Sequence, residues 1–283
     1  MMFDRSRWIV PSRSDPRWLL ATFLGTYVVL GDLLLSFNRS PGQIVAAVVS
    51  CCALDMLYTW VIARKLLLPL SGVISGLGLA ILFSAPGSPW LILLASWIAI
   101  SEKYLVTWRG HHLFNPTNLA MVVIVFVSGG QAAVAPAYQW GGYGWVSLTV
   151  LALGLVVMWR VNKLPMVLSF WAVFVAGAFL RSYMVHVPVI ITLWAQVTSG
   201  AFMLYSFFMI TDPKTSPAST GNMIIFGAAI GLADLVLQLN TAVYSLFYAL
   251  AIITATRGLW FVARDMSAAR HRKVQQVAAP VRS

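Results

Sequence analysis

Residues 197–232 read VTSGAFMLYSFFMITDPKTSPASTGNMIIFGAAIGL, in which a polar segment separates two apolar runs. The polar segment, MITDPKTSP at residues 209–217, contains two prolines, one aspartate, one lysine and three hydroxyl side chains. The flanking runs belong to apolar segments at 186–210 and 217–237. Each segment is long enough to cross a bilayer, which takes about 20 residues. Because a proline lacks the backbone N–H that continues a helix, the stretch predicts two membrane helices joined by a polar turn.

The composition of the whole chain supports a membrane location. Hydrophobic residues make up 60% of the 283 residues, charged residues make up 10%, and the mean hydropathy is +0.83. A soluble domain carries about 25% charged residues. The basic, proline-containing N-terminus also lacks the apolar core and cleavage site of a signal peptide. We therefore expect an all-α, polytopic protein whose main surroundings are the lipid bilayer.

Apolar runs between polar, proline or glycine breaks predict ten membrane spans. They cover residues 18–37, 42–62, 67–85, 89–107, 116–130, 143–160, 164–182, 186–210, 217–237 and 241–261. With both termini in the cytoplasm, 17 of the 19 lysines and arginines lie on the inner side, and only Arg39 and Arg181 lie outside. Because positive charge accumulates in cytoplasmic loops, this topology in a bacterial-type inner membrane is favoured. The net charge of +11 then indicates orientation and anionic lipid, and no nucleic-acid partner is expected.

Two stretches share one pattern: Ser-Gly, an apolar run, proline, a short polar gap and Ser-Pro. They are ISGLGLAILFSAPGSP at residues 74–89 and TSGAFMLYSFFMITDPKTSP at residues 198–217. The second copy lies five spans after the first, an odd number, so it runs in the opposite direction, as in the inverted repeats of transporters. Only the second copy contains the charged pair Asp212 and Lys214. We expect a cytoplasmic segment at 1–17, five-helix repeats at 18–130 and 131–261, and a basic, flexible cytoplasmic tail at 262–283.

Polar residues cluster where two predicted helices begin on the cytoplasmic side. Asn115 and Ser216 each precede a proline, an arrangement that caps helix starts. Two helix N-termini with basic neighbours can bind a phosphate or a carboxylate, although an ordinary cytoplasmic loop has the same composition. The candidate cofactor-binding residues of this cluster are His111, His112, Asn115, Thr211, Asp212, Lys214, Thr215 and Ser216.

Few carboxylates lie at bilayer depth, where each costs a few kcal/mol. Asp55 and Asp234 are placed deepest, and Glu102 lies near an inner span end. They form either an ion or proton path, or protonated carboxyls bonded to neighbouring helices. No metal-binding spacing, phosphate-binding glycine motif or nucleophile–base arrangement occurs. The sequence therefore predicts no metal and no catalytic residue, and the chain is at most a component of an oxidoreductase complex.

The first half of the chain resembles the RnfD protein of the Rnf electron-transport complex and the NqrB protein of the sodium-translocating NADH:quinone reductase. The shared features are a Ser-x-x-x-[Ser/Thr]-Gly opening at residues 71–76, a helix end with Lys103, and Phe114-Asn115-Pro116. In the second half, TDPKTSP at residues 211–217 is similar to the TDPxTSP signature of that family. The resemblance covers about residues 65–261 and implies a fold related in architecture to urea and ammonium channels.

The resemblance also implies a redox-driven ion pump with flavin, but this chain departs from the family at the flavin anchor. The family's members attach FMN to the threonine of a Ser-Gly-Ala-Thr type motif. Here Ser199-Gly200-Ala201 is followed by Phe202, so no covalent FMN is expected. A non-covalent flavin or quinone, or a cofactor supplied by another membrane or peripheral subunit, would have to replace it.

Three functions are therefore weighed. The leading hypothesis is an integral membrane subunit of an electron-transport complex that binds flavin or quinone non-covalently or provides an ion path. The first alternative is a stand-alone channel or transporter for a small solute or ion. The second is a structural accessory subunit of a larger membrane complex, without a cofactor.

Overall fold

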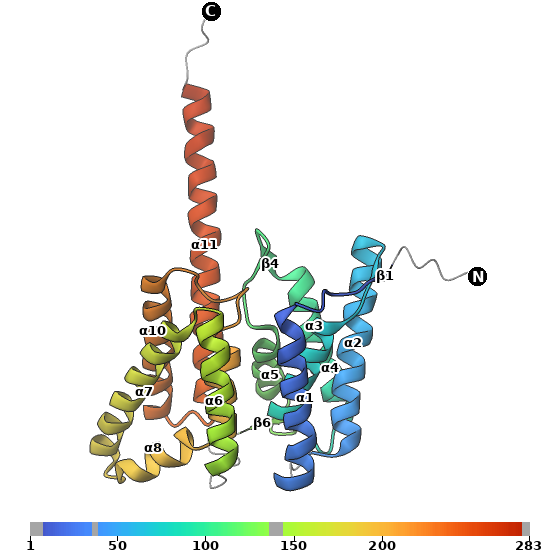
Figure 1. Ribbon diagram of the computed structural model, residues 1–283. Helices are drawn as coiled ribbons and strands as arrows, with labels where there is room; N and C mark the ends of the chain where they lie inside the picture. Colours follow the sequence, from blue (N-terminus) through green and yellow to red (C-terminus); the bar gives the residue numbers. More distant parts are fainter. Residues whose placement is uncertain (1–7, 36–38, 136–143, 279–283) are drawn as a thin grey trace, which may run out of the picture.

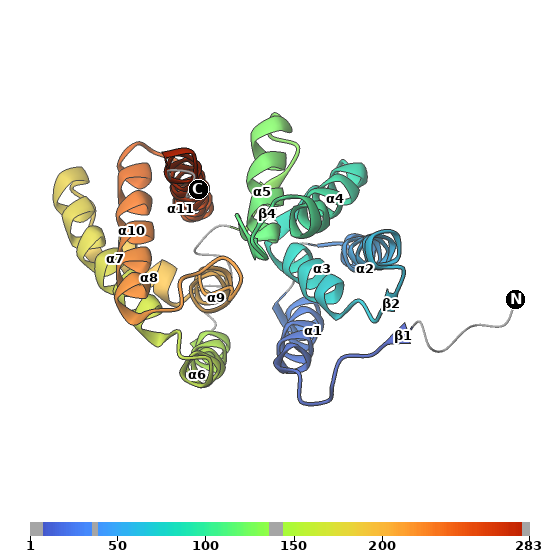
Figure 2. The same ribbon diagram turned by 90° about the horizontal axis from the view of Figure 1, so that it is seen from above.

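The computed structural model describes residues 8–35, 39–135 and 144–278, most of which are helical. Figures 1 and 2 show two groups of helices side by side, one from each half of the chain. The first group comprises α1 (Pro16–Leu35), α2 (Pro41–Ala63), α3 (Leu70–Leu82), α4 (Pro89–Leu105) and α5 (Pro116–Val127). The second comprises α6 (Gly144–Arg160), α7 (Leu164–Val185), α8 (Val189–Val197), α9 (Gly200–Leu204), the π-helical turn η2 (Tyr205–Met209), α10 (Thr220–Leu239) and α11 (Ser245–Ala278).

Four helices of the described residues are long and apolar enough to cross a membrane: α2, α7, α10 and the Ser245–Ser267 part of α11. Shorter apolar helices lie at Leu70–Leu82, Pro116–Val127, Leu148–Arg160 and Gly200–Met209. Large apolar side chains on the outer faces of these helices are exposed, among them Val49, Leu168 and Ile225. The protein is therefore an all-α polytopic membrane protein, as the composition predicts.

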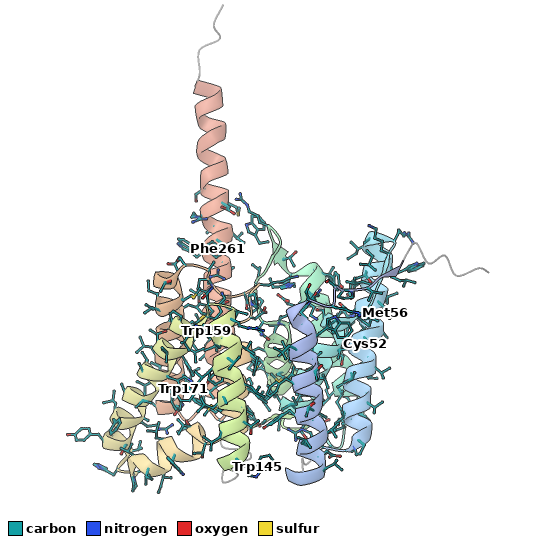
Figure 3. All side chains as sticks on the ribbon, viewed as in Figure 1. Cys52, Met56, Trp145, Trp159, Trp171 and Phe261 are labelled. Atoms are coloured by element: carbon teal, nitrogen blue, oxygen red, sulfur yellow. The ribbon has the colours of Figure 1, made fainter. Side chains whose placement is uncertain are left out.

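Aromatic side chains mark the two ends of α6. Trp145 and Trp159 lie at its opposite ends, as Figure 3 shows, and their exposed fractions are 52% and 72%. With a rise of 1.5 Å per residue, about 21 Å of helix separates them. Exposed tryptophans gather at membrane–water interfaces, so both ends of α6 carry the residue type that is typical of an interface.

The segment predicted as one span at 186–210 consists of three short pieces, α8, α9 and η2. Pro188 precedes α8, and Ser199 caps α9 by accepting hydrogen bonds from the backbone N–H groups of Ala201 and Phe202. The π-helical turn then ends at Met209, directly before the TDPKTSP segment. The chain therefore changes direction within this span instead of crossing as a straight helix.

The helix after the TDPKTSP segment begins later than the sequence predicts. The Ser216-Pro217 pair is not its start, because α10 begins at Thr220 with Ser219 as its N-cap. The predicted start at Asn115-Pro116 is correct, because α5 begins at Pro116. Ser40-Pro41 and Ser88-Pro89 open α2 and α4 in the same way. Ser216 instead accepts a hydrogen bond from a buried lysine, which is described below.

Three pairs of two-residue strands connect the helices. β1 (Trp8–Ile9) pairs with β2 (Leu66–Leu67), and β3 (Phe83–Ser84) pairs with β6 (Ala133–Val134). β4 (Thr107–Trp108) and β5 (His111–His112) form a hairpin. Its turn residues Arg109 and Gly110 both have positive φ, +50° and +80°, which matches the twist of a two-residue hairpin turn.

Contacts across the molecule join the two halves. The Asn118 side-chain amide on α5 donates to the Phe247 carbonyl on α11 at 3.0 Å. Further out, the Asp265 carboxylate on α11 accepts from Trp108 Nε1 and pairs with Arg109 Nε, each at 2.9 Å. The β4–β5 hairpin of the first half is thus held against the last helix of the second half.

Candidate functional site

A cavity of about 330 Å³ lies where the two halves meet. Its walls come from α1, α3, the end of α4, β5, the start of α5, the α9–η2 region and the connection to α10. The apolar part of the lining consists of Leu20, Leu24, Ile74, Ile81, Leu82, Pro116, Leu204, Phe208, Met209 and Pro213. A flat or elongated apolar group therefore finds a suitable wall inside it.

The rest of the lining is polar and carries a surplus of positive charge. Three cationic side chains, Arg17, Lys103 and Lys214, line the cavity together with one carboxylate, Asp212. His112, Asn115 and three hydroxyl residues, Ser71, Ser75 and Thr117, complete the polar lining. Such a lining favours a ligand that joins an anionic group to an apolar body.

Lys103 is held in place by the start of α3. Its ammonium group donates to the Ser71 carbonyl at 3.0 Å and to the Ser71 hydroxyl at 2.9 Å. Because a lysine ammonium has three donors, one N–H remains beyond these two bonds. Lys103 is thus a fixed positive charge at the cavity wall rather than a mobile surface lysine.

Asn115 connects the start of α5 with the end of η2. Its side-chain oxygen accepts from Asn118 N at 3.0 Å, which caps α5. Its side-chain nitrogen donates to the Met209 carbonyl at 3.2 Å. One residue therefore positions two walls of the cavity, which come from different halves of the chain.

The TDPKTSP segment is folded around Asp212. The Asp212 side chain accepts from Lys214 N at 3.1 Å, and its carbonyl accepts from Thr215 N at 3.2 Å and Ser216 N at 2.9 Å. Burial raises the pKa of the Asp212 carboxyl, while the Lys214 N–H and the Lys103 charge act in the opposite direction. The turn thus presents both Asp212 and Lys214 to the cavity.

Two basic side chains stabilise this turn by donating hydrogen bonds to it. Lys163, which is buried before α7, donates to the Ser216 hydroxyl at 2.9 Å and to the Pro217 carbonyl at 2.6 Å. Arg257 on α11 donates to the Thr215 carbonyl. Burial and the neighbouring Arg257 lower the pKa of Lys163. Neither residue is indicated as part of the site by the sequence patterns, which only place both on the cytoplasmic side by charge.

Lys163→Met is expected to lower the free energy of unfolding by about 2 kcal/mol, because it leaves two buried acceptors without a donor. The exposed Arg160 on the preceding helix end provides the matched control, Arg160→Met. Thermal unfolding of both variants in detergent measures the difference. Equal midpoints for the two variants would mean that Lys163 does not support the turn.

The predicted cofactor-binding residues fall into two sets. His112, Asn115, Asp212 and Lys214 line one cavity, although the chain separates the first two from the last two by almost a hundred residues. Thr211, Thr215 and Ser216 are buried and bond within the protein, and their hydroxyls donate to the carbonyls of Phe207, Asp212 and Thr211, respectively. The His111 side chain lies outside the described residues.

The three carboxylates predicted as an ion path lie in separate places, and none of them is part of the cavity lining. Asp55 accepts from Gly72 N at 3.0 Å and from Tyr104 OH at 2.7 Å, which anchors the start of α3. Asp234 accepts from Gln238 Nε2 at 2.6 Å. Glu102 accepts from Phe114 N at 3.1 Å. Their role in ion movement stays a prediction.

Comparison with known proteins concerns the second half of the chain. Residues 132–263 match the model of the NQR2, RnfD, RnfE family. This range contains the TDPKTSP turn, Lys163 and Arg257, which form and support one wall of the cavity. No curated protein matched the chain.

Proposed function

Since residues 132–263 match the model of the NQR2, RnfD, RnfE family, we propose that the chain is a membrane subunit of an Rnf- or Nqr-type electron-transport complex that holds a flavin or quinone non-covalently. The proposal rests on one observation, the cavity between the halves with its three cationic side chains and apolar wall. Other membrane or peripheral subunits would supply and remove the electrons.

The donor set of the cavity fits FMN better than a quinone. A phosphate is an anion that lysine and arginine bind through charge-assisted hydrogen bonds, and Arg17, Lys103 and Lys214 are present. A planar ring system can pack against the apolar side chains of α1, α3 and η2. A quinone would use the apolar wall but would bring no anion to Lys103 and Lys214, whereas Arg17 already pairs with Asp15 at 2.6 Å. A bound flavin would supply one- and two-electron redox chemistry.

Burial of the Ser-Gly-Ala segment supports non-covalent binding. Ser199, Gly200, Ala201 and Phe202 are all buried at the start of α9. Phe202 packs among Phe170, Trp171 and Phe174. The position that would carry an anchoring threonine is thus filled by a core aromatic residue, which offers no hydroxyl for attachment.

We also propose that the halves are inverted repeats, with both termini in the cytoplasm of an inner-membrane protein. The packing order supports the repeat. In the first half α2 packs on α4, α4 on α5, and α1 on α3; in the second half α7 packs on α10, α10 on α11, and α6 on α9. In each half, the third span ends early in a non-helical segment, at β3 and at the TDPKTSP turn.

The alternative of a channel or transporter has less support. Asp55 is fully engaged in holding α3, and the void beside Asp234 is only about 10 Å³, room for about one water molecule. A continuous polar route past these carboxylates would be needed for conduction. The accessory-subunit alternative would leave the lined cavity without a ligand.

The proposal is tested by the visible spectrum of the full chain purified from membranes. We expect flavin absorbance, or its appearance when FMN is added, and complete release of the flavin on denaturation. A colourless protein that binds neither FMN nor a quinone would contradict the proposal. Flavin that stays attached after denaturation would contradict the non-covalent mode.

A further inference from the structure

A buried acid–base pair borders the cavity behind its polar lining. Glu102, in the last turn of α4, is 1% exposed, and His112, on β5, is 8% exposed. Glu102 Oε2 lies 3.6 Å from His112 Nδ1. That distance is within range for an ion pair but is longer than a good hydrogen bond. His112 is also part of the cavity lining, so one member of the pair faces the ligand space.

The surroundings of Glu102 favour the state in which the pair carries a proton, either on His112 as imidazolium or on the Glu102 carboxyl. Glu102 Oε1 accepts from Phe114 N at 3.1 Å, whereas Oε2 has no hydrogen-bond partner among the described residues. An ionised carboxylate with an unsatisfied buried oxygen is costly. The cost falls when a proton sits on His112, forming an ion pair, or on Glu102 itself. Loss of that proton would leave an uncompensated buried negative charge.

Other charges around the pair act in both directions. Asp212 adds a negative charge that favours retention of the proton, and Lys103, next to Glu102 in α4, opposes it. Arg17 and Lys214 line the same cavity as His112 and neutralise part of an incoming anion. A ligand that adds negative charge to the cavity increases the affinity of the pair for a proton.

We propose that Glu102 and His112 form a proton-exchange site of the cavity, which takes up a proton when an anionic ligand binds and returns it to a basic atom of that ligand. On return, an N–H bond of the imidazolium breaks and an O–H or N–H bond forms on the ligand. Neutral imidazole then remains beside the Glu102 carboxylate, and a proton from water restores the pair. The identity of the ligand rests on the proposed function; the acid–base pairing does not.

The ligand-free protein tests the pairing. Histidine-labelled protein in nanodiscs is titrated by NMR, and the His112 signal is assigned by its loss in His112→Gln. Glu102→Gln keeps an acceptor for Phe114 N but removes the charge. We expect it to lower the titration midpoint of His112 by about one to three pH units. An unchanged midpoint of His112 would overturn the proposal.

Calorimetric titration with FMN in two buffers of different ionisation heat tests the link to the ligand. We expect wild-type protein to take up at most about half a proton per FMN at the His112 midpoint, where the free protein is already half protonated. Glu102→Gln should bind FMN without this uptake. Equal uptake by both proteins would contradict proton exchange at this pair. Absence of FMN binding by the wild type would contradict the proposed flavin site, while the NMR titration would still decide the pairing.

Discussion

Replacing Gly227 by alanine is expected to destabilise the protein by about 3 kcal/mol or more, because the added carbon has no room. A Cβ at position 227 would lie 2.2 Å from the Met166 carbonyl oxygen and 2.3 Å from the Ser169 hydroxyl. Both atoms belong to α7, and one is backbone. The clash therefore forces α7 and α10 apart instead of moving a flexible side chain. Small residues allow such close approach of membrane helices.

The same helix contains the matched control. A Cβ at Gly221 would meet no atom within 4 Å. Gly221→Ala should leave the thermal unfolding midpoint in detergent unchanged or slightly higher, because alanine favours a helix over glycine. Similar midpoints for the two variants would show that the close contact between α7 and α10 does not determine the effect of alanine at position 227.

Lys103→Gln is expected to weaken FMN binding about 10- to 100-fold. A hydrogen bond to a charged group contributes about 1.5–3 kcal/mol, and about 1.4 kcal/mol corresponds to a factor of ten in affinity. Lys103 is one of three cations in the cavity and is fixed by Ser71. The measurement is a fluorescence titration of the full chain with FMN.

Two comparisons make this result specific. Lys65→Gln removes an exposed lysine between α2 and β2, outside the cavity lining, and should bind FMN as the wild type does. Riboflavin, which has no phosphate, should lose much less affinity than FMN when Lys103 is replaced. An equal loss for FMN and riboflavin would place the phosphate away from Lys103.

Hydropathy and capping patterns predicted most of the helices, because both patterns depend only on residues that are close to one another in the sequence. Apolar runs located α2, α7 and α10, and Asn115-Pro116 marked the start of α5 correctly. The pair Ser216-Pro217 was wrongly predicted to start a helix, because it lies in a turn that the Lys163 side chain stabilises through hydrogen bonds. That lysine is 53 positions away in the chain, so no local pattern reveals it.

The candidate site was predicted in part. Asp212 and Lys214 were indicated because the first copy of the repeat lacks these charges, and His112 and Asn115 because they lie in the polar cluster at a predicted helix start. Arg17 gave no comparable signal, because its place in the cavity depends on how α1 packs on α3. The pairing of Glu102 with His112 depends on the hairpin that returns β5 to the end of α4. Both contacts follow from tertiary packing.

The most direct test of the cavity as the cofactor site is photolabelling of the full chain with a photoreactive azido-FMN, followed by mass spectrometry of the labelled peptides. We expect label on cavity residues of α3, of α5 or of residues 204–214, and loss of the label when excess FMN is present. Label confined to the outer faces of α6 or α7, or label that FMN does not displace, would contradict a flavin site between the two halves.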